Sequence, residues 1–300
     1  MPETPYSTVF HQTALAAGLI CACLTLHAAA QPLPTATGDT ITLPTHAGHQ
    51  LFIPEGLTAS PNGLDLLVHF HGDPTTLHNN AAYAELDVAI VSVNYNGLSS
   101  AYSGPFSDAA LFGEVLDAAL TSLRARPEFA DDLEFDALSV SSFSAGFAAV
   151  REVLKQPTYF DRIDGLLMAD SLYASFQGSG DNTPHDSQMV DFRRFAKAAA
   201  DGGKTMIVTH SQVQTTTYSN TAETADDLTK TVGVTSTATT QTGLGTLDFY
   251  RTAEHGNFRM WGATGADGDA HLEHLRYIGE WLDDLPLDRQ ARSDDPPPGG

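Results

Sequence analysis

Short apolar runs alternate with amphipathic stretches along most of the chain. The runs are rich in Val, Ile, Leu and Phe, and turn-forming residues separate them, as is typical of buried strands. They cover residues 50–53, 65–70, 88–93, 137–140, 165–168, 205–209 and 258–261. Between them, apolar residues recur at helical spacing in 108–123, with Ser107 or Asp108 as the expected N-cap, and in 147–154, 187–200 and 270–282.

Strands that alternate with helices predict an α/β fold, with a mostly parallel central sheet and helices on both of its faces. Residues 31–287 are expected to form this one domain. Two segments depart from the pattern. Residues 212–245 are polar and Thr-rich, and we expect them to pass over the carboxyl edge of the sheet. Residues 288–300 end in Asp-Asp-Pro-Pro-Pro-Gly-Gly and are predicted to be a disordered tail.

The first 30 residues are predicted to be an export signal. Residues 13–30 are almost entirely apolar and end in three alanines followed by Gln31, which matches a signal-peptidase cleavage pattern. The region before them lacks Lys and Arg, unlike most signals. The apolar stretch is short for a membrane helix, so we expect a secreted or periplasmic protein without stable membrane association.

Cysteine and charge exclude several classes of function. Both cysteines, Cys21 and Cys23, lie in the predicted signal, so the mature chain is expected to have no disulfide, no thiolate metal site and no cysteine nucleophile. The formal net charge is −22. Nucleic acids and anionic membranes require basic patches, so we expect neither as a partner.

A possible nucleophile lies in residues 142–146, Ser-Phe-Ser-Ala-Gly, between a predicted strand and a predicted helix. A nucleophile elbow needs this context, because its serine is raised on a sharp turn with small residues two positions before and after it. Gly146 meets this requirement, while Ser142 stands where glycine is usual. We therefore predict that Ser144 is a catalytic nucleophile. The alternative is an ordinary Ser-rich loop.

A second strand, residues 65–70, leads into His71-Gly72-Asp73 about 70 residues before Ser144. Together with the elbow, this order resembles the α/β-hydrolase superfamily in its secreted bacterial, serine esterase-like form. The resemblance implies an oxyanion hole formed by backbone amides. Gly72 or Asp73 would supply one amide and Ala145 the other. No cofactor or metal is implied.

The resemblance also places the general base after the last strand. His271 follows the run 258–261 and begins the last predicted helix, where the helix dipole favours a neutral imidazole. His255, which precedes a Gly-Asn turn, is the alternative base, and His274 is expected to be structural.

The acid that completes the triad is the least determined of the three residues. The usual position, after the run 205–209, holds no carboxylate. Asp170 follows the preceding strand, where some members of the superfamily place their acid, and it preserves the chain order Ser, Asp, His. We predict Asp170, with Glu223 and Asp269 as alternatives.

Two other functions remain open from the sequence. His69 and His71 are two residues apart on a predicted strand and are followed by Asp73, a spacing that zinc-dependent hydrolases also use. A non-catalytic module with a hydrolase fold could instead bind a ligand in the same cleft. The favoured prediction is hydrolysis of a carboxylic ester, either a small molecule or a polymer, through an acyl-enzyme.

Overall fold

A ten-stranded sheet runs through the centre of the computed structural model, which describes residues 32–178 and 180–290. The strand order is β1-β2-β4-β3-β5-β6-β9-β12-β11-β10. The neighbours from β4 to β12 pair in parallel, and the pairs beyond them at either end are antiparallel. The strands are β1 (Gly38–Thr42), β2 (His49–Pro54), β3 (Leu64–Phe70), β4 (Ala89–Val93), β5 (Phe135–Phe143), β6 (Gly165–Ala169), β9 (Thr205–His210), β10 (Thr237–Ala238), β11 (Phe249–His255) and β12 (Phe258–Ala263).

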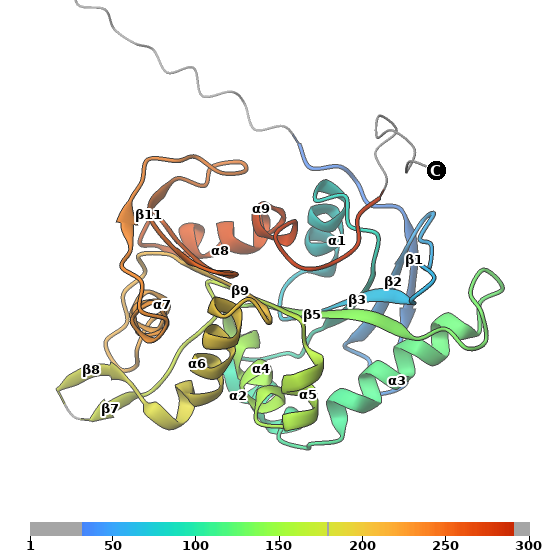
Figure 1. Cartoon of the computed structure of the whole chain (residues 1–300), viewed down its shortest axis with the longest axis horizontal. Helices are drawn as coiled ribbons and strands as arrows, with labels where there is room; N and C mark the ends of the chain where they lie inside the picture. The colour runs from blue at the N-terminus through green and yellow to red at the C-terminus, as the bar shows by residue number, and fades with distance from the viewer. Residues whose placement is uncertain (1–31, 179, 291–300) are drawn as a thin grey trace, which may run out of the picture.

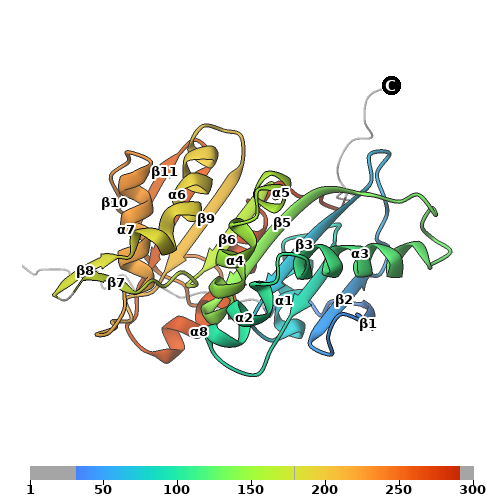
Figure 2. The ribbon, with the colours of Figure 1, turned by 90° about the horizontal axis from the view of Figure 1, so that it is seen from below.

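Helices cover both faces of this sheet (Figure 1). One layer holds α1 (Pro74–Tyr83), α8 (Gly268–Arg276) and α9 (Gly279–Leu282). The other holds α2 (Ser99–Phe106), α3 (Leu111–Arg124), α4 (Phe147–Leu154), α5 (Pro157–Arg162), α6 (Asp186–Ala200) and α7 (Thr221–Thr231), which lie in front of the sheet in Figure 2. A small hairpin, β7 (Phe176–Gly178) and β8 (Asp181–Pro184), extends from this second layer. The predicted α/β class is confirmed.

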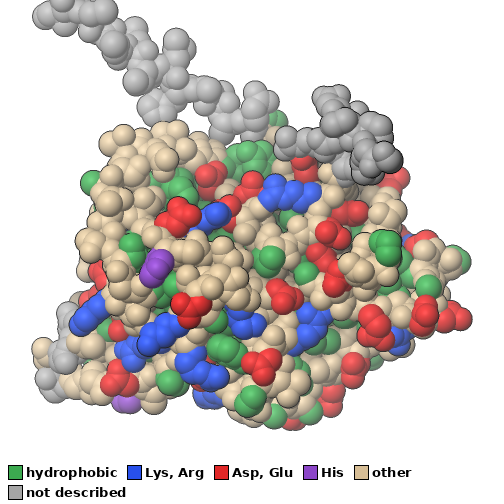
Figure 3. All heavy atoms as spheres, in the orientation of Figure 1, with side chains coloured by type: hydrophobic (Ala, Val, Ile, Leu, Met, Phe, Trp, Pro, Cys, Tyr) green, Lys and Arg blue, Asp and Glu red, His purple; other side chains and the backbone are tan. Residues whose placement is uncertain are grey.

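On the face shown in Figure 3, Asp and Glu side chains are interspersed with Lys and Arg side chains. No helix in the described part of the chain is long and apolar enough to cross a membrane.

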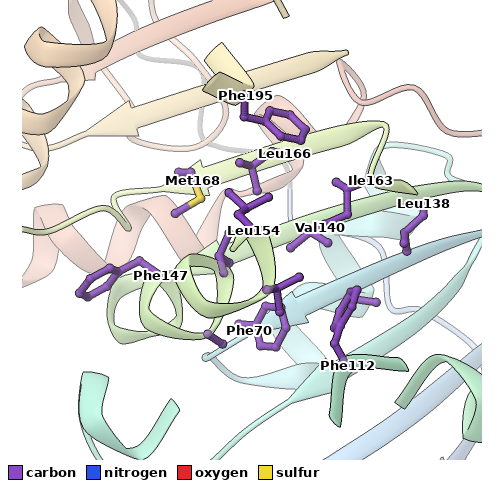
Figure 4. Packing of buried hydrophobic residues seen from close by; sticks show 14 of the residues in the cluster. Phe70, Phe112, Leu138, Val140, Phe147, Leu154, Ile163, Leu166, Met168 and Phe195 are labelled. Carbon is purple, nitrogen blue, oxygen red and sulfur yellow. The ribbon is translucent and has the colours of Figure 1, made fainter. Parts of the chain in front are cut away.

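Two apolar cores form because alternate residues of each central strand point to opposite faces. Leu66 and Val68 of β3 belong to the core under α2–α6, whereas Leu67 belongs to the core under α1, α8 and α9. Each of these three side chains is completely buried. Figure 4 shows part of the larger core, where α4 lies over β3, β5 and β6. This packing holds the carboxyl end of β5 firmly against its neighbours.

The predicted runs all correspond to strands, but several other elements were not predicted. The missed elements are β1, β11, α1, α2, α5, the β7–β8 hairpin, and α7 with β10, which lie within the polar segment 212–245. The predicted cap of the helix at 108–123 was wrong. Helix α3 begins at Leu111 after Ala110, which makes no side-chain capping bond, and Asp108 instead bonds the Ala110 amide in the preceding turn.

The last predicted helix, 270–282, is two helices, α8 and α9. The buried side chain of Asn80 explains the break, because it accepts a hydrogen bond from the Gly279 amide (2.8 Å) and donates one to the Arg276 carbonyl (3.1 Å). These bonds satisfy backbone groups that a continuous helix would have used itself.

Of the two predicted terminal segments, only the tail overlaps the described residues, at 288–290. The export signal, residues 1–30, lies outside them, as do residues 291–300 of the predicted tail. The first residues of that tail are bonded to the fold. The Asp87 amide donates to the Asp288 carbonyl (2.9 Å), and the Gln290 amide donates to the Glu85 carbonyl (2.8 Å).

Candidate active site

The carboxyl ends of the parallel strands bring the predicted site residues to one edge of the sheet. Phe143, the last residue of β5, is paired in register with Ala169, the last residue of β6. The next residue of each strand is a predicted site residue, Ser144 in one case and Asp170 in the other. Adjacent parallel strands therefore place the proposed nucleophile and the proposed acid side by side.

Ser144 lies on a sharp turn between β5 and α4. Its φ is 48°, in the left-handed region that non-glycine residues rarely adopt. The short turn Ser144–Gly146 leads directly into α4. Gly146 is required for space, since a Cβ atom there would lie 2.2 Å from the Phe70 carbonyl oxygen. The half-buried Ser144 thus stands where a nucleophile elbow is built.

Ser142, the departure from the usual glycine, is accommodated by hydrogen bonds. Its buried hydroxyl lies 2.8 Å from the hydroxyl of Ser171. Ser171 donates its own proton to the Ser144 carbonyl oxygen (2.9 Å), so Ser142 is the donor in the contact between the two hydroxyls. The additional side chain thereby links the elbow to the loop after β6.

His271 and Asp170 are in direct contact. Nδ1 of His271, in the first half of α8, lies 2.7 Å from Oδ2 of Asp170. The imidazole also stacks on the ring of Phe143, with centroids 4.6 Å apart. Phe143 immediately precedes Ser144, so the histidine is held beside the elbow by one hydrogen bond and one ring contact.

The second carboxylate oxygen of Asp170 is bonded as well. Oδ1 accepts hydrogen bonds from the Ser211 amide (3.0 Å) and from the hydroxyl of Thr221 at the start of α7. Burial by itself raises the pKa of this carboxyl, but interactions with His274 and His271 and the hydrogen bond from Thr221 outweigh burial. The pKa of Asp170 consequently lies below its usual range, and the group is a carboxylate at neutral pH.

Backbone strain is concentrated around these residues. Four non-glycine residues of the described chain have positive φ, and three of them are His71 (69°), Ser144 (48°) and Asp170 (42°). Such conformations cost about 1–3 kcal/mol each and persist where the surrounding structure enforces them. Strain of this kind clusters at functional sites, and here it occurs after three adjacent strands, β3, β5 and β6.

The predicted oxyanion loop follows β3. The Gly72 amide donates to Oδ1 of Asn94 (2.9 Å) and is thereby occupied. The Asp73 amide has no protein acceptor within the described residues. The Asp73 side chain caps α1 by accepting from the Thr76 amide (2.7 Å). Of the two predicted amides in this loop, that of Asp73 is the one left available, while Ala145 follows Ser144 directly.

Comparisons with known proteins show likeness in structure only. No protein-family model matches the chain, and no curated protein matches it. Similar solved structures include a feruloyl esterase module from Clostridium thermocellum, which is 11% identical with a TM-score of 0.44 and matches 88% of this chain and 98% of its own. Acetyl xylan esterase from Aspergillus awamori is 16% identical with a TM-score of 0.42, over 80% of this chain and 99% of its own. A dienelactone hydrolase-like phosphotriesterase from metagenomic libraries is 12% identical with a TM-score of 0.43, over 84% of this chain and 99% of its own.

The arrangement of strands decides the fold class. An antiparallel start leads into the parallel series β4-β3-β5-β6-β9-β12, with a strand-turn-helix at Ser144 in its centre and the histidine-bearing helix after β12. The chain has the α/β-hydrolase fold.

Other predicted acids and bases of this hydrolase fold lie in different surroundings. Glu223 accepts a hydrogen bond from the Asn220 amide (2.9 Å) and forms the capping box of α7. Asp269 is exposed in the first turn of α8.

His255 lies where β11 turns into β12, opposite the start of β9, and therefore at the amino edge of the sheet, away from Ser144. His274 is completely buried, with Nδ1 bonded to the Thr209 hydroxyl (2.6 Å).

The position where the family usually carries its acid has a different role here. Gln212 accepts from the Gly265 amide (3.1 Å) through its side chain and donates its own amide to the Gly265 carbonyl (2.8 Å). This pair of bonds joins the loop after β9 to the loop that leads into α8. Gln212 thereby supports the helix that carries His271.

The zinc alternative does not fit the geometry of its proposed ligands. His71 lies beyond the end of β3 with a left-handed backbone, so it does not continue the strand alternation predicted from His69. Both ring nitrogens of the buried His69 are bonded to protein, Nδ1 to the Ser141 hydroxyl (2.7 Å) and Nε2 to the His71 carbonyl (2.9 Å). No group of three or more His, Cys, Asp or Glu side chains arranged to hold a metal occurs in residues 32–178 and 180–290.

Ser211 and Thr221, the two donors to Asp170, were not predicted from the sequence. A signal for the second was present, since Asn220 followed by Glu223 is the pattern of a capping box and marks the start of a helix. The Ser211 amide left no signal, because a backbone donor is not encoded by a residue type.

Proposed function

We propose that this chain is a serine hydrolase that cleaves a carboxylic ester, with Ser144, His271 and Asp170 as its catalytic triad. The observation that carries the proposal is the 2.7 Å hydrogen bond between Asp170 and His271, formed beside the strained turn at Ser144. A histidine with a purely structural role would not need a buried carboxylate that two further donors hold in place. A histidine oriented by a carboxylate in this way is the arrangement that activates a serine.

The protonation states follow from the geometry. Because Asp170 is a carboxylate and only accepts, the His271 proton resides on Nδ1 and the lone pair on Nε2. Nε2 would remove the proton of the Ser144 hydroxyl as its oxygen attacks the ester carbonyl carbon. The proton then passes from Nε2 to the leaving alcohol as the C–O bond breaks. Water, activated by the same nitrogen, releases the acid from the acyl-enzyme.

Backbone amides would stabilise the tetrahedral intermediate. The amide of Ala145 lies at the start of α4, where the helix dipole favours negative charge. The amide of Asp73 is the second candidate, because it lacks a protein acceptor within the described residues while that of Gly72 is bonded to Asn94. Each amide of such a pair stabilises the transition state by about 3–4 kcal/mol.

A fluorophosphonate probe tests the proposal, because it reacts covalently with an activated serine and leaves ordinary serines unmodified. We expect intact-mass spectrometry to show one adduct on the wild-type protein and none on Ser144→Ala. Ser142→Ala is the matched control, since Ser142 belongs to the same motif but its hydroxyl is bonded to Ser171. This variant should still be labelled. A wild-type protein without an adduct, or an adduct that persists in Ser144→Ala, would contradict the serine mechanism.

A further inference from the structure

A second histidine, His71, lies at the edge of the candidate site without a role in the triad. It directly precedes the oxyanion loop, and its ring is nearly parallel to that of Phe143, with centroids 6.0 Å apart. Phe143 also stacks on His271. Burial lowers the pKa of His71, and the neighbouring His271 lowers it further, so the ring is neutral at neutral pH and lies within electrostatic range of the proposed base.

Hydrogen bonding occupies one nitrogen of this ring. Nδ1 of His71 lies 2.8 Å from the hydroxyl oxygen of Tyr102, a completely buried residue. That oxygen accepts a hydrogen bond from the Tyr95 amide (3.1 Å) and lies 3.4 Å from the Tyr95 carbonyl. The Tyr102 hydroxyl thus has two acceptors within reach, Nδ1 of His71 and the Tyr95 carbonyl. Whichever of them takes its proton, Nδ1 is occupied by Tyr102.

Nε2 of His71 is the ring nitrogen that is left for a ligand. It has no protein partner in the described part of the chain, and it is not one of the buried polar atoms left without a partner there. His71 is half-buried, so this nitrogen is open to solvent. The backbone holds the residue in the left-handed region, with φ of 69°. This conformation costs about 1–3 kcal/mol of conformational free energy, and such strain is typical of functional sites.

Resting on the proposed function, we propose that His71 is a specificity residue, whose Nε2–H donates a hydrogen bond to a hydroxyl or ether oxygen of the substrate near the scissile ester. The backbone amides already provide for the carbonyl oxygen, which leaves this side chain for a second oxygen. The preferred substrates would be esters with an oxygen-rich alcohol or acyl part, such as polyol esters. Tyr102 acts as a positioning residue that keeps the proton on Nε2.

Two fluorophosphonate-biotin probes of equal length measure this preference, and neither requires the natural substrate. One carries an alkyl linker and the other a poly(ethylene glycol) linker, whose ether oxygens accept hydrogen bonds. A neutral hydrogen bond is expected to favour the ether probe by about threefold to tenfold in the second-order rate constant of labelling. In His71→Phe, which retains a ring next to Phe143, the ratio of the two rates should fall by that factor.

Tyr102→Phe provides a second variant in which His71 is retained. Without the hydroxyl, the proton on the His71 ring is no longer confined to Nε2, so the rate ratio should lie between those of wild type and His71→Phe. An equal ratio in wild type and His71→Phe would overturn the proposal. If neither probe labels the wild-type protein, the serine mechanism itself fails, which is a separate result.

Discussion

At the scale of single residues, the candidate site depends on how Asp170 is held. Its carboxylate is buried, yet each oxygen has a partner, since Oδ2 contacts His271 while Oδ1 accepts from Ser211 and Thr221. Burial of an unpaired charge would cost several kcal/mol, and these donors offset that cost. They also fix the direction in which the carboxylate presents Oδ2 to the imidazole.

Thr221→Val tests this positioning. The change removes the hydroxyl and preserves the shape of the side chain, so Oδ1 retains only the Ser211 amide. We expect kcat to fall about tenfold, because a hydrogen bond to a charged group contributes about 1.5–3 kcal/mol and part of it orients the Asp170 carboxylate toward His271. KM should remain within about twofold of the wild-type value, since the change does not affect interactions that the substrate makes equally in its ground state and its transition state.

Thr221→Ser is the matched control, because it retains the hydroxyl and should keep most of the wild-type kcat. Steady-state kinetics with a short-chain p-nitrophenyl ester measure both constants. Equal losses in the Val and Ser variants, or a change in KM alone, would show that Thr221 serves packing and not the orientation of Asp170.

At the scale of elements, buried polar contacts determine where the last helix ends and how it approaches the sheet. Asn80 of α1 bonds to backbone groups on both sides of the break between α8 and α9, at Arg276 and Gly279. Gly279 is also required for space, because a Cβ atom there would lie 2.9 Å from Oδ1 of Asn80. The direction of α8, and with it the position of His271, thus depends on a contact with α1.

Asn80→Ala is expected to destabilise the protein by about 2–3 kcal/mol, since it leaves the buried Gly279 amide and the Arg276 carbonyl without their partner. Chemical denaturation monitored by tryptophan fluorescence measures the free energy of unfolding. Thr75→Ala, an exposed change on the same helix, is the control and should stay within about 0.5 kcal/mol of wild type. Similar losses in both variants would argue against the role of Asn80 at the break.

At the scale of the whole molecule, buried histidines couple stability to pH. Five histidines of the described chain are buried, namely His49, His69, His78, His210 and His274. Burial is the main cause that lowers the pKa of His69 to about 3 and the pKa of each of the other four to about 4. In the unfolded chain each histidine titrates near its ordinary pKa of 6.5. The unfolded state therefore binds more protons than the folded state between about pH 6.5 and pH 4.

Stability should consequently fall as the pH decreases through this window. Each such histidine lowers the free energy of unfolding by about 1.4 kcal/mol per unit of decreasing pH, over the range in which it is protonated in the unfolded state and neutral in the folded state. We expect the free energy of unfolding to decrease steeply between about pH 6.5 and 4.5 and to change little between about pH 7 and 8. Denaturant titrations at a series of pH values measure it.

His78→Phe isolates one contribution, since His78 stacks on Phe52 with centroids 4.0 Å apart and its Nε2 lacks a partner among the described residues. The variant should show a shallower slope by the equivalent of one proton. A slope that is the same in both proteins, or a stability that rises on acidification, would contradict the assignment of neutral buried histidines.

The sequence by itself determined β2 and the parallel strands of the sheet, the strand-turn-helix at Ser144 and the chain order that led to His271. Each of these is written in local patterns, namely apolar runs, small residues around a serine, and position along the chain. The alternation of strands and helices was also sufficient for the fold class, because it leaves few ways to bury both faces of a parallel sheet.

Only the tertiary structure decided which carboxylate contacts His271. The sequence favoured Asp170 and left Glu223 and Asp269 as alternatives, and the register of β5 with β6 places Asp170 next to Ser144. The same holds for His255, which the β11–β12 hairpin carries to the opposite edge. Strand register and helix direction arise from contacts between segments far apart in the chain, such as Asn80 with Gly279. Local propensity contains no record of such contacts, which is why the sequence left those alternatives open.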